Sequence, residues 1–115
     1  MFIKRLAILC CLGYCAIAQA GSGGGQIVSF TPVVSNGTEF VVFVVQDMNS
    51  DKASCNTDVR FTLSAADPKY KSVLAAMMGS YFSGTSIFVR GKGTCTTYAG
   101  NEDVSYVCFN GGVPC

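Results

Sequence analysis

The sequence predicts a mainly β fold with one helix, folded as a single domain behind an export signal. Three observations predict it. Short runs rich in Val, Ile, Phe and Thr alternate with Gly- and Asn-containing turns, as in a sheet of short strands. Apolar residues recur at helical spacing in a single stretch. The chain beyond residue 20 carries an even number of cysteines, which is typical of a small disulfide-bonded domain.

Residues 1–20 have the three parts of a secretory signal peptide. Lys4 and Arg5 precede an apolar run over residues 6–17, and residues 18–20 form an Ala-Gln-Ala cleavage site. The run is shorter than the ~20 residues that a membrane-spanning helix needs. We therefore expect cleavage after Ala20 and export to the periplasm or the medium, without stable membrane insertion afterwards.

Two alternatives to a cleaved signal are an uncleaved anchor and a lipoprotein. A lipid-attachment site needs a small residue before its cysteine, whereas Cys10, Cys11 and Cys15 follow Leu, Cys and Tyr. Cleavage removes two of the eight basic residues, so the seven acidic residues then exceed the basic ones by one. A nearly neutral domain of this kind is not expected to bind nucleic acid.

Four cysteines remain after cleavage: Cys55, Cys95, Cys108 and Cys115. They allow three sets of two disulfides. We favour Cys55–Cys95 with Cys108–Cys115, because the second pair would close a short Gly-Gly-Val-Pro turn. A zinc site is disfavoured by the absence of histidine and of a C-x-x-C pair, so we expect no metal.

The order of elements begins with a flexible Gly/Ser leader over residues 21–25, followed by one domain over residues 26–115. Strands are predicted over residues 27–34 and 39–46, with a hairpin at Asn36-Gly37. Pro32 should lie at a sheet edge or a bulge, because it has no N–H to donate. The continuous apolar run of the second strand indicates burial on both faces.

A third strand is predicted over residues 59–63 and the helix follows it. Asp67 can cap the helix, Pro68 suits its first position and Gly84 ends it. The predicted core stripe of the helix is Tyr70, Val73, Leu74, Met77, Met78 and Tyr81. The opposite face is small and uncharged (Ser72, Ala75, Ala76, Gly79 and Ser80), which indicates either close packing against the same helix of a second copy or a plain exposed surface.

Two further strands are predicted over residues 85–90 and 104–109. The predicted order is strand, strand, strand, helix, strand, strand, which is that of the OB-fold, a five-stranded Greek-key barrel. The alternative is an α+β sandwich with the same order and an open sheet.

The chain contains few residues that are candidates for catalysis or ligand binding. Without histidine there is no Ser-His-Asp triad, and we expect neither an enzyme nor a cofactor. Glu102-Asp103 is interpreted as a solvated turn. Tyr98, in a loop rich in Thr and Gly, and Tyr81 are the candidates for ligand contact, because a tyrosine ring can stack while its hydroxyl bonds to a partner.

The segment from Ser54 to Cys95 resembles a known family. A cysteine before a short strand, an amphipathic helix ending in residues 81–84 (Tyr-Phe-Ser-Gly) and a strand over residues 86–90 resemble B subunits of the subtilase-cytotoxin and typhoid-toxin type. The resemblance implies an exported OB-fold protein of a virulence system that forms a homopentameric ring, binds host-cell glycans and carries a toxin A subunit. The family's sugar-contacting residues have no match here, since their places fall before Ile27 and near Gly91.

The sequence thus leads to two functional expectations. The first is an exported binding module that forms a homo-oligomer and takes a glycan receptor and an A subunit as partners. The alternative is a monomeric periplasmic or secreted protein, such as an inhibitor or envelope-associated factor.

Overall fold

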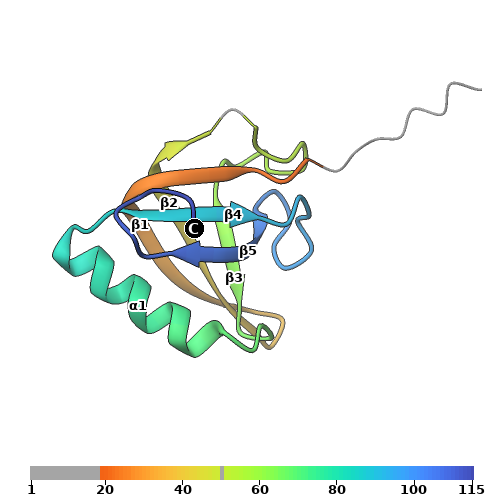
Figure 1. Cartoon of the computed structure of the whole chain (residues 1–115). Helices are drawn as coiled ribbons and strands as arrows, with labels where there is room; N and C mark the ends of the chain where they lie inside the picture. Colours follow the sequence, from red (N-terminus) through yellow and green to blue (C-terminus); the bar gives the residue numbers. More distant parts are fainter. Residues whose placement is uncertain (1–18, 50) are drawn as a thin grey trace, which may run out of the picture.

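The computed structural model describes residues 19–49 and 51–115 (Figure 1). The predicted signal segment lies outside the described residues, except for its last two positions. The described part contains five strands and one helix: β1 (Ser22–Ser35), β2 (Thr38–Met48), β3 (Phe61–Ser64), α1 (Tyr70–Ser83), β4 (Ile87–Gly91) and β5 (Glu102–Cys108). The prediction of a mainly β chain with one helix is confirmed.

The five strands close into a ring in the order β1-β2-β3-β5-β4, with β4 returning to β1. All neighbours are antiparallel except β3 and β5, which run parallel. The long strand β1 pairs with two neighbours. Its first residues, Ser22–Gly25, pair with β4, and most of its length pairs with β2. Register shifts around Ile27 let β1 bend between its two partners.

The predicted hairpin between β1 and β2 is confirmed. Asn36 and Gly37 both have positive φ, 52° and 75°, as the tight two-residue turn requires, and Ser35 pairs with Thr38 across it. Pro32 pairs with Val41 and lies in the part of β1 that β4 does not reach. It is therefore on an edge, as predicted, and the bulges lie elsewhere.

Residues 21–25 do not form the flexible leader that their composition predicted. Ser22 and Gly23 are buried, and Gly23 opposes Val89 of β4 on one side and Met48 of β2 on the other. A Cβ at Gly23 would lie 2.8 Å from Val45 and 3.1 Å from Phe61. Glycine is used here because the strand passes directly over core side chains, which leaves no room for a side chain of its own.

The helix begins later than predicted. α1 starts at Tyr70, and the Asp67 carboxylate accepts a hydrogen bond from the Lys69 N–H at 2.9 Å in the turn before the helix. The end is as predicted: Gly84 has a left-handed φ of 69° and its N–H bonds to the Ser80 carbonyl.

Strand β3 also begins later than predicted, at Phe61, since Val59 has a positive φ of 56°, which is not a strand conformation.

The hydrophobic core fills the inside of the ring. β2 contributes Val41, Phe43 and Val45 to it, and Phe40 and Val42 on the other face are also buried, which confirms the predicted burial on both faces. The remaining core residues are Ile27, Phe61, Leu63, Tyr70, Met77, Ile87, Val89 and Val104.

The predicted helix stripe is correct only in part. Tyr70 and Met77 are buried and Val73 and Leu74 pack against the core, but Met78 and Tyr81 are exposed. In Figure 1 the helix lies across one end of the ring. The face of the helix that packs on the ring is narrower than the predicted apolar stripe.

Both favoured disulfides are present, Cys55–Cys95 and Cys108–Cys115, with Cα–Cα distances of 6.0 Å and 5.9 Å. Cys55 lies in the loop before β3 and Cys95 in the loop before β5. The first bridge therefore links the two segments that lead into the parallel strand pair. In the described ranges, no helix has the length and apolar character needed to cross a membrane.

Candidate functional site

A pocket lies where β3 and β5 diverge. The two parallel strands pair only at Phe61 with Glu102 and at Thr62 with Asp103. Beyond this point the strands diverge toward the start of α1 and leave a pocket of about 490 Å³, here called the seam pocket. It is lined by Thr62, Ser64, Ala66, Asp67, Pro68, Lys69, Lys92, Thr94, Thr96, Thr97, Asp103, Val104 and Ser105.

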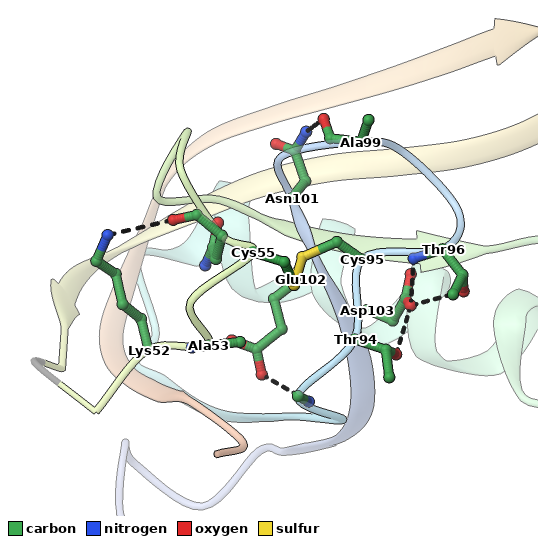
Figure 2. The surroundings of a disulfide bond; sticks show 12 residues. Lys52, Ala53, Cys55, Thr94, Cys95, Thr96, Ala99, Asn101, Glu102 and Asp103 are labelled. Atoms are coloured by element: carbon green, nitrogen blue, oxygen red, sulfur yellow. Dashed lines mark hydrogen bonds between the residues drawn. A yellow bond between two sulfur atoms is a disulfide. The ribbon is translucent and has the colours of Figure 1, made fainter. Parts of the chain in front are cut away.

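One wall of the seam pocket is a threonine-rich loop wrapped around the Asp103 carboxylate. Its Oδ2 atom accepts hydrogen bonds from the Thr94 hydroxyl at 2.7 Å and from the Thr96 hydroxyl and N–H at 2.8 Å and 2.9 Å. The Thr97 N–H donates to Oδ1 at 3.1 Å. Figure 2 shows Thr94 and Thr96 converging on this carboxylate beside the Cys55–Cys95 disulfide. The loop is therefore shaped by the carboxylate that it encloses.

The same contacts determine the charge state of Asp103. Burial acts to raise its pKa, but the hydrogen bonds from Thr96, Thr94 and Thr97 outweigh burial and hold the pKa below its usual value. A carboxylate with a lowered pKa that already accepts four hydrogen bonds is a poor proton acceptor. Asp103 therefore fixes the pocket wall and is badly placed to act as a base.

Thr62 supplies a polar group that the fold leaves unsatisfied. It is 1% exposed and lines the seam pocket, and its hydroxyl has no hydrogen-bond partner within residues 19–49 and 51–115. A buried hydroxyl without a partner costs about 1–3 kcal/mol. Because Thr62 lines the seam pocket, its unpaired hydroxyl is a candidate group for hydrogen-bonding a ligand.

The rest of the seam pocket is rich in hydroxyls and carries two cations. Ser64 and Ser105 add hydroxyl groups from β3 and β5, while Lys69 and Lys92 contribute ammonium groups. A smaller pocket of about 160 Å³ adjoins it and is lined by the half-exposed Tyr106. The two pockets share Asp67, Lys69, Val104 and Ser105. Hydroxyls beside an aromatic ring suit a ligand that carries many hydroxyls of its own.

The two tyrosines predicted to contact ligand lie outside the seam pocket. Tyr98 is 38% exposed, and its ring packs against Phe40 with centroids 5.1 Å apart, so it covers the outer face of β2. Tyr81 stacks on Phe30 at 6.1 Å and meets the edge of Phe82 at 5.4 Å, on the face where α1 crosses β1. The structure does not bring Tyr81 or Tyr98 into the wall of either pocket described above.

Four of the five residues predicted to form an interface lie on the outer face of α1. Ser72, Ala75, Ala76 and Gly79 are not buried, and a Cβ at Gly79 would meet nothing within 4 Å. Ser80 is buried, so its assignment to this face is wrong; the helix turns it toward the barrel. Met78 and Phe82 join the exposed face, and Phe82 is 80% exposed.

Glu102 and Asp103 are not the solvated turn that their sequence suggested. Glu102 is fully buried and Asp103 is 5% exposed, both at the start of β5. Adjacent strand residues point to opposite faces, and Figure 2 shows Glu102 directed toward Ala53 while Asp103 meets the threonines. The sequence signal for the Asp103 site is the cluster of threonines around Cys95, whose hydroxyls need an acceptor.

Within the described part of the chain, no group of three or more His, Cys, Asp or Glu side chains could hold a metal ion. Comparison of the chain with protein-family models, with curated proteins and with solved structures finds no match.

Proposed function

We propose that this chain is an exported OB-fold binding module that takes a glycan in the seam pocket and assembles with copies of itself through α1. The observation that carries the glycan proposal is the unsatisfied Thr62 hydroxyl in a pocket lined by hydroxyls. The OB-fold assignment is supported by a five-stranded ring in the order β1-β2-β3-β5-β4, with a helix between β3 and β4.

A glycan fits the seam pocket because of what the pocket offers. Sugar hydroxyls both donate and accept hydrogen bonds, and so can the hydroxyls of Thr62, Ser64 and Ser105. The ammonium groups of Lys69 and Lys92 add donors for ring oxygens or for a carboxylate on an acidic sugar. The resemblance to toxin B subunits, which bind host-cell glycans, points to the same ligand class.

Self-assembly is supported by the outer face of α1. Lys71 is the only charged residue in the helix, and Ala75, Ala76 and Gly79 lie beside the exposed Met78 and Phe82. An apolar patch of this kind is unusual on the surface of a monomer. Small residues let a second helix approach closely, so a second copy of α1 is the occupant that we propose.

The glycan proposal is tested with Thr62→Val, which keeps the shape of the side chain and removes the hydroxyl. Binding to an array of neutral and acidic glycans should fall about tenfold or more, while the melting temperature stays equal or rises, because a buried unpaired group is lost. Lys71→Gln, outside the pocket, is the matched control. Unchanged binding by the Thr62→Val variant, or no glycan bound by the wild type, would contradict the proposal.

Assembly is tested by light scattering on the exported protein. The wild type should have the mass of several subunits, with five as the number that the resemblance implies. Ala76→Glu should yield a folded monomer, because burying an unpaired carboxylate between two helices is costly. Ser54→Glu, at an exposed loop position, should leave the mass unchanged. A monomeric wild type would favour the alternative of a single-chain periplasmic or secreted factor.

A further inference from the structure

Glu102 is a fully buried carboxylate that lies where the chain enters the ring. Its oxygens accept three backbone N–H groups: Gly21 at 2.8 Å, Gly93 at 3.1 Å and Ala53 at 3.2 Å. There is no room beside the carboxylate for side chains on the neighbouring glycines. A Cβ on Gly91 would overlap the carboxylate, and a Cβ on Gly21 would lie 2.6 Å from Oε1. The fold therefore reserves a closely fitted place for this group.

What Glu102 lacks is a positive partner. The ion pairs among residues 19–49 and 51–115 are Arg60–Asp58 and Arg90–Asp51, and neither includes Glu102. Burying an ionised carboxylate is costly unless a charge of opposite sign accompanies it. Backbone N–H groups reduce this cost but bring no charge.

The missing charge is one that export would create. Gly21 is the first residue after the predicted cleavage site, and its nitrogen is the closest of the three donors to Glu102. Gly21 is buried, and its carbonyl also accepts the Gly91 N–H at 2.8 Å, so both of its backbone groups are held in the ring. The position that becomes the N-terminus is thus already fixed against the carboxylate.

We propose that cleavage after Ala20 completes the fold by placing the new α-ammonium group of Gly21 in a buried ion pair with Glu102. A signal peptidase adds water across the Ala20–Gly21 peptide bond, which leaves a carboxylate on Ala20 and an ammonium on Gly21. The amide N–H that donates to Glu102 Oε2 in the uncut chain becomes an –NH₃⁺ group at the same place. The precursor holds Glu102 by hydrogen bonds alone, and the processed protein holds it by charge as well.

This ion pair makes the processed barrel more stable than the precursor barrel. Gly93 lies against the segment that is removed, since a Cβ there would meet Ala20 N at 3.3 Å and the Gln19 carbonyl carbon at 3.3 Å. Removal of residues 19 and 20 therefore opens space beside the new ammonium group without disturbing the strand that begins at Ser22. The stability of the processed protein therefore depends on the position at which the N-terminus is cut. This dependence is independent of the proposed glycan and assembly sites.

The test uses the full precursor, expressed in an exporting host, in two forms. One is the natural chain, and the other has Ser-Thr inserted between Ala20 and Gly21, so that processing leaves two residues ahead of Gly21. Intact mass must show the natural product starting at Gly21. We expect it to melt about 10 °C above the extended product, because the extension moves the charge away from Glu102.

Glu102→Gln in both chains completes a double-mutant cycle, and it should reduce the difference in melting temperature to about 2 °C or less. Natural cleavage at another residue, equal melting of the two wild-type products, or a difference that persists in the Glu102→Gln chains would overturn the proposal. If Glu102→Gln does not fold, the Gly21 amine is probed with an amine-selective reagent instead. Reaction in the folded wild type should be about tenfold or more slower than in guanidinium; equal rates would refute the ion pair.

Discussion

Thr96 donates both its N–H and its hydroxyl to a single oxygen of Asp103, at 2.9 Å and 2.8 Å. This pair anchors the loop that forms one wall of the seam pocket. Burial alone would raise the Asp103 pKa, and the donors from Thr96, Thr94 and Thr97 reverse that effect. Since the folded-state pKa is lowered, the carboxylate stabilises the fold above its unfolded pKa of about 4, and this contribution is lost as the pH falls below that value.

Asp103→Asn should lower the free energy of unfolding at pH 7 by about 1–3 kcal/mol, because charge-assisted hydrogen bonds are replaced by weaker ones. Urea denaturation measures this loss. Between about pH 4 and pH 2 the variant should lose less stability than the wild type does. Asp47→Asn, at an exposed carboxylate, is the control. An unchanged acid dependence in the Asp103→Asn variant would show that Asp103 does not anchor the loop.

Tyr70→Phe tests the contact between the helix start and β2. Burial, and then the hydrogen bond and charge of Glu39, raise the pKa of the Tyr70 hydroxyl, which donates to Glu39 Oε1 at 3.1 Å. The neutral form is favoured in the fold, so its contribution is present below pH ~10 and is lost as the pH rises above it. The variant should lose about 1 kcal/mol at pH 7 in chemical denaturation. It should also be less sensitive than the wild type to pH above about 10.

Two glycine-to-alanine changes should have opposite effects. Gly91→Ala would drive a Cβ into the buried Glu102 and should cost about 2 kcal/mol or more, as overpacking of a core does. Gly79→Ala lies in the interior of α1 with open space around it in the single chain and should stabilise the fold of that single chain by about 0.5–1 kcal/mol. Thermal denaturation of both variants decides the point. A Gly91→Ala variant as stable as the wild type would show that Glu102 is free to move.

Removing each disulfide by paired Cys→Ser changes should give unequal losses. The bridge between Cys55 and Cys95 spans 40 residues and the one between Cys108 and Cys115 spans 7. Loop-closure entropy then predicts losses of about 4 kcal/mol and about 2 kcal/mol, respectively. Guanidinium denaturation of the two double variants measures the difference. Equal losses would mean that native contacts, and not chain entropy, determine what the bridges contribute.

Local rules predicted the features that depend on neighbouring residues. The Asn36-Gly37 turn, the Gly84 helix end and the pairing of Cys108 with Cys115 each follow from a short stretch of chain. Met78 illustrates the limit of the helical pattern, because the pattern placed it in the core stripe and it is 44% exposed. Its spacing does not show how much of α1 the barrel can cover, so the width of the buried face emerges only from packing.

Long-range packing decided the features that were missed. The glycines at positions 23–25 have no side chains to form a pattern, and at Gly23 the core side chains Val45 and Phe61 leave room only for backbone. Glu102 was expected to be solvated because two adjacent acids usually are. Two of its three partners, Gly21 and Ala53, lie 81 and 49 residues away, and no local pattern could indicate them.

The seam between β3 and β5 has a further consequence for how this barrel can come apart. Every other junction of the ring is a longer antiparallel ladder, whereas this one has two residue pairs. Parallel strands enter a sheet from the same edge, and the Cys55–Cys95 bridge joins the two incoming segments at that edge. The disulfide thus holds β3 and β5 together at the end where they enter the sheet, so the strands would separate from their other end, toward Ser64 and Ser105. Once this disulfide is reduced, we expect the ladder between β3 and β5, the shortest in the ring, to be the junction that separates first.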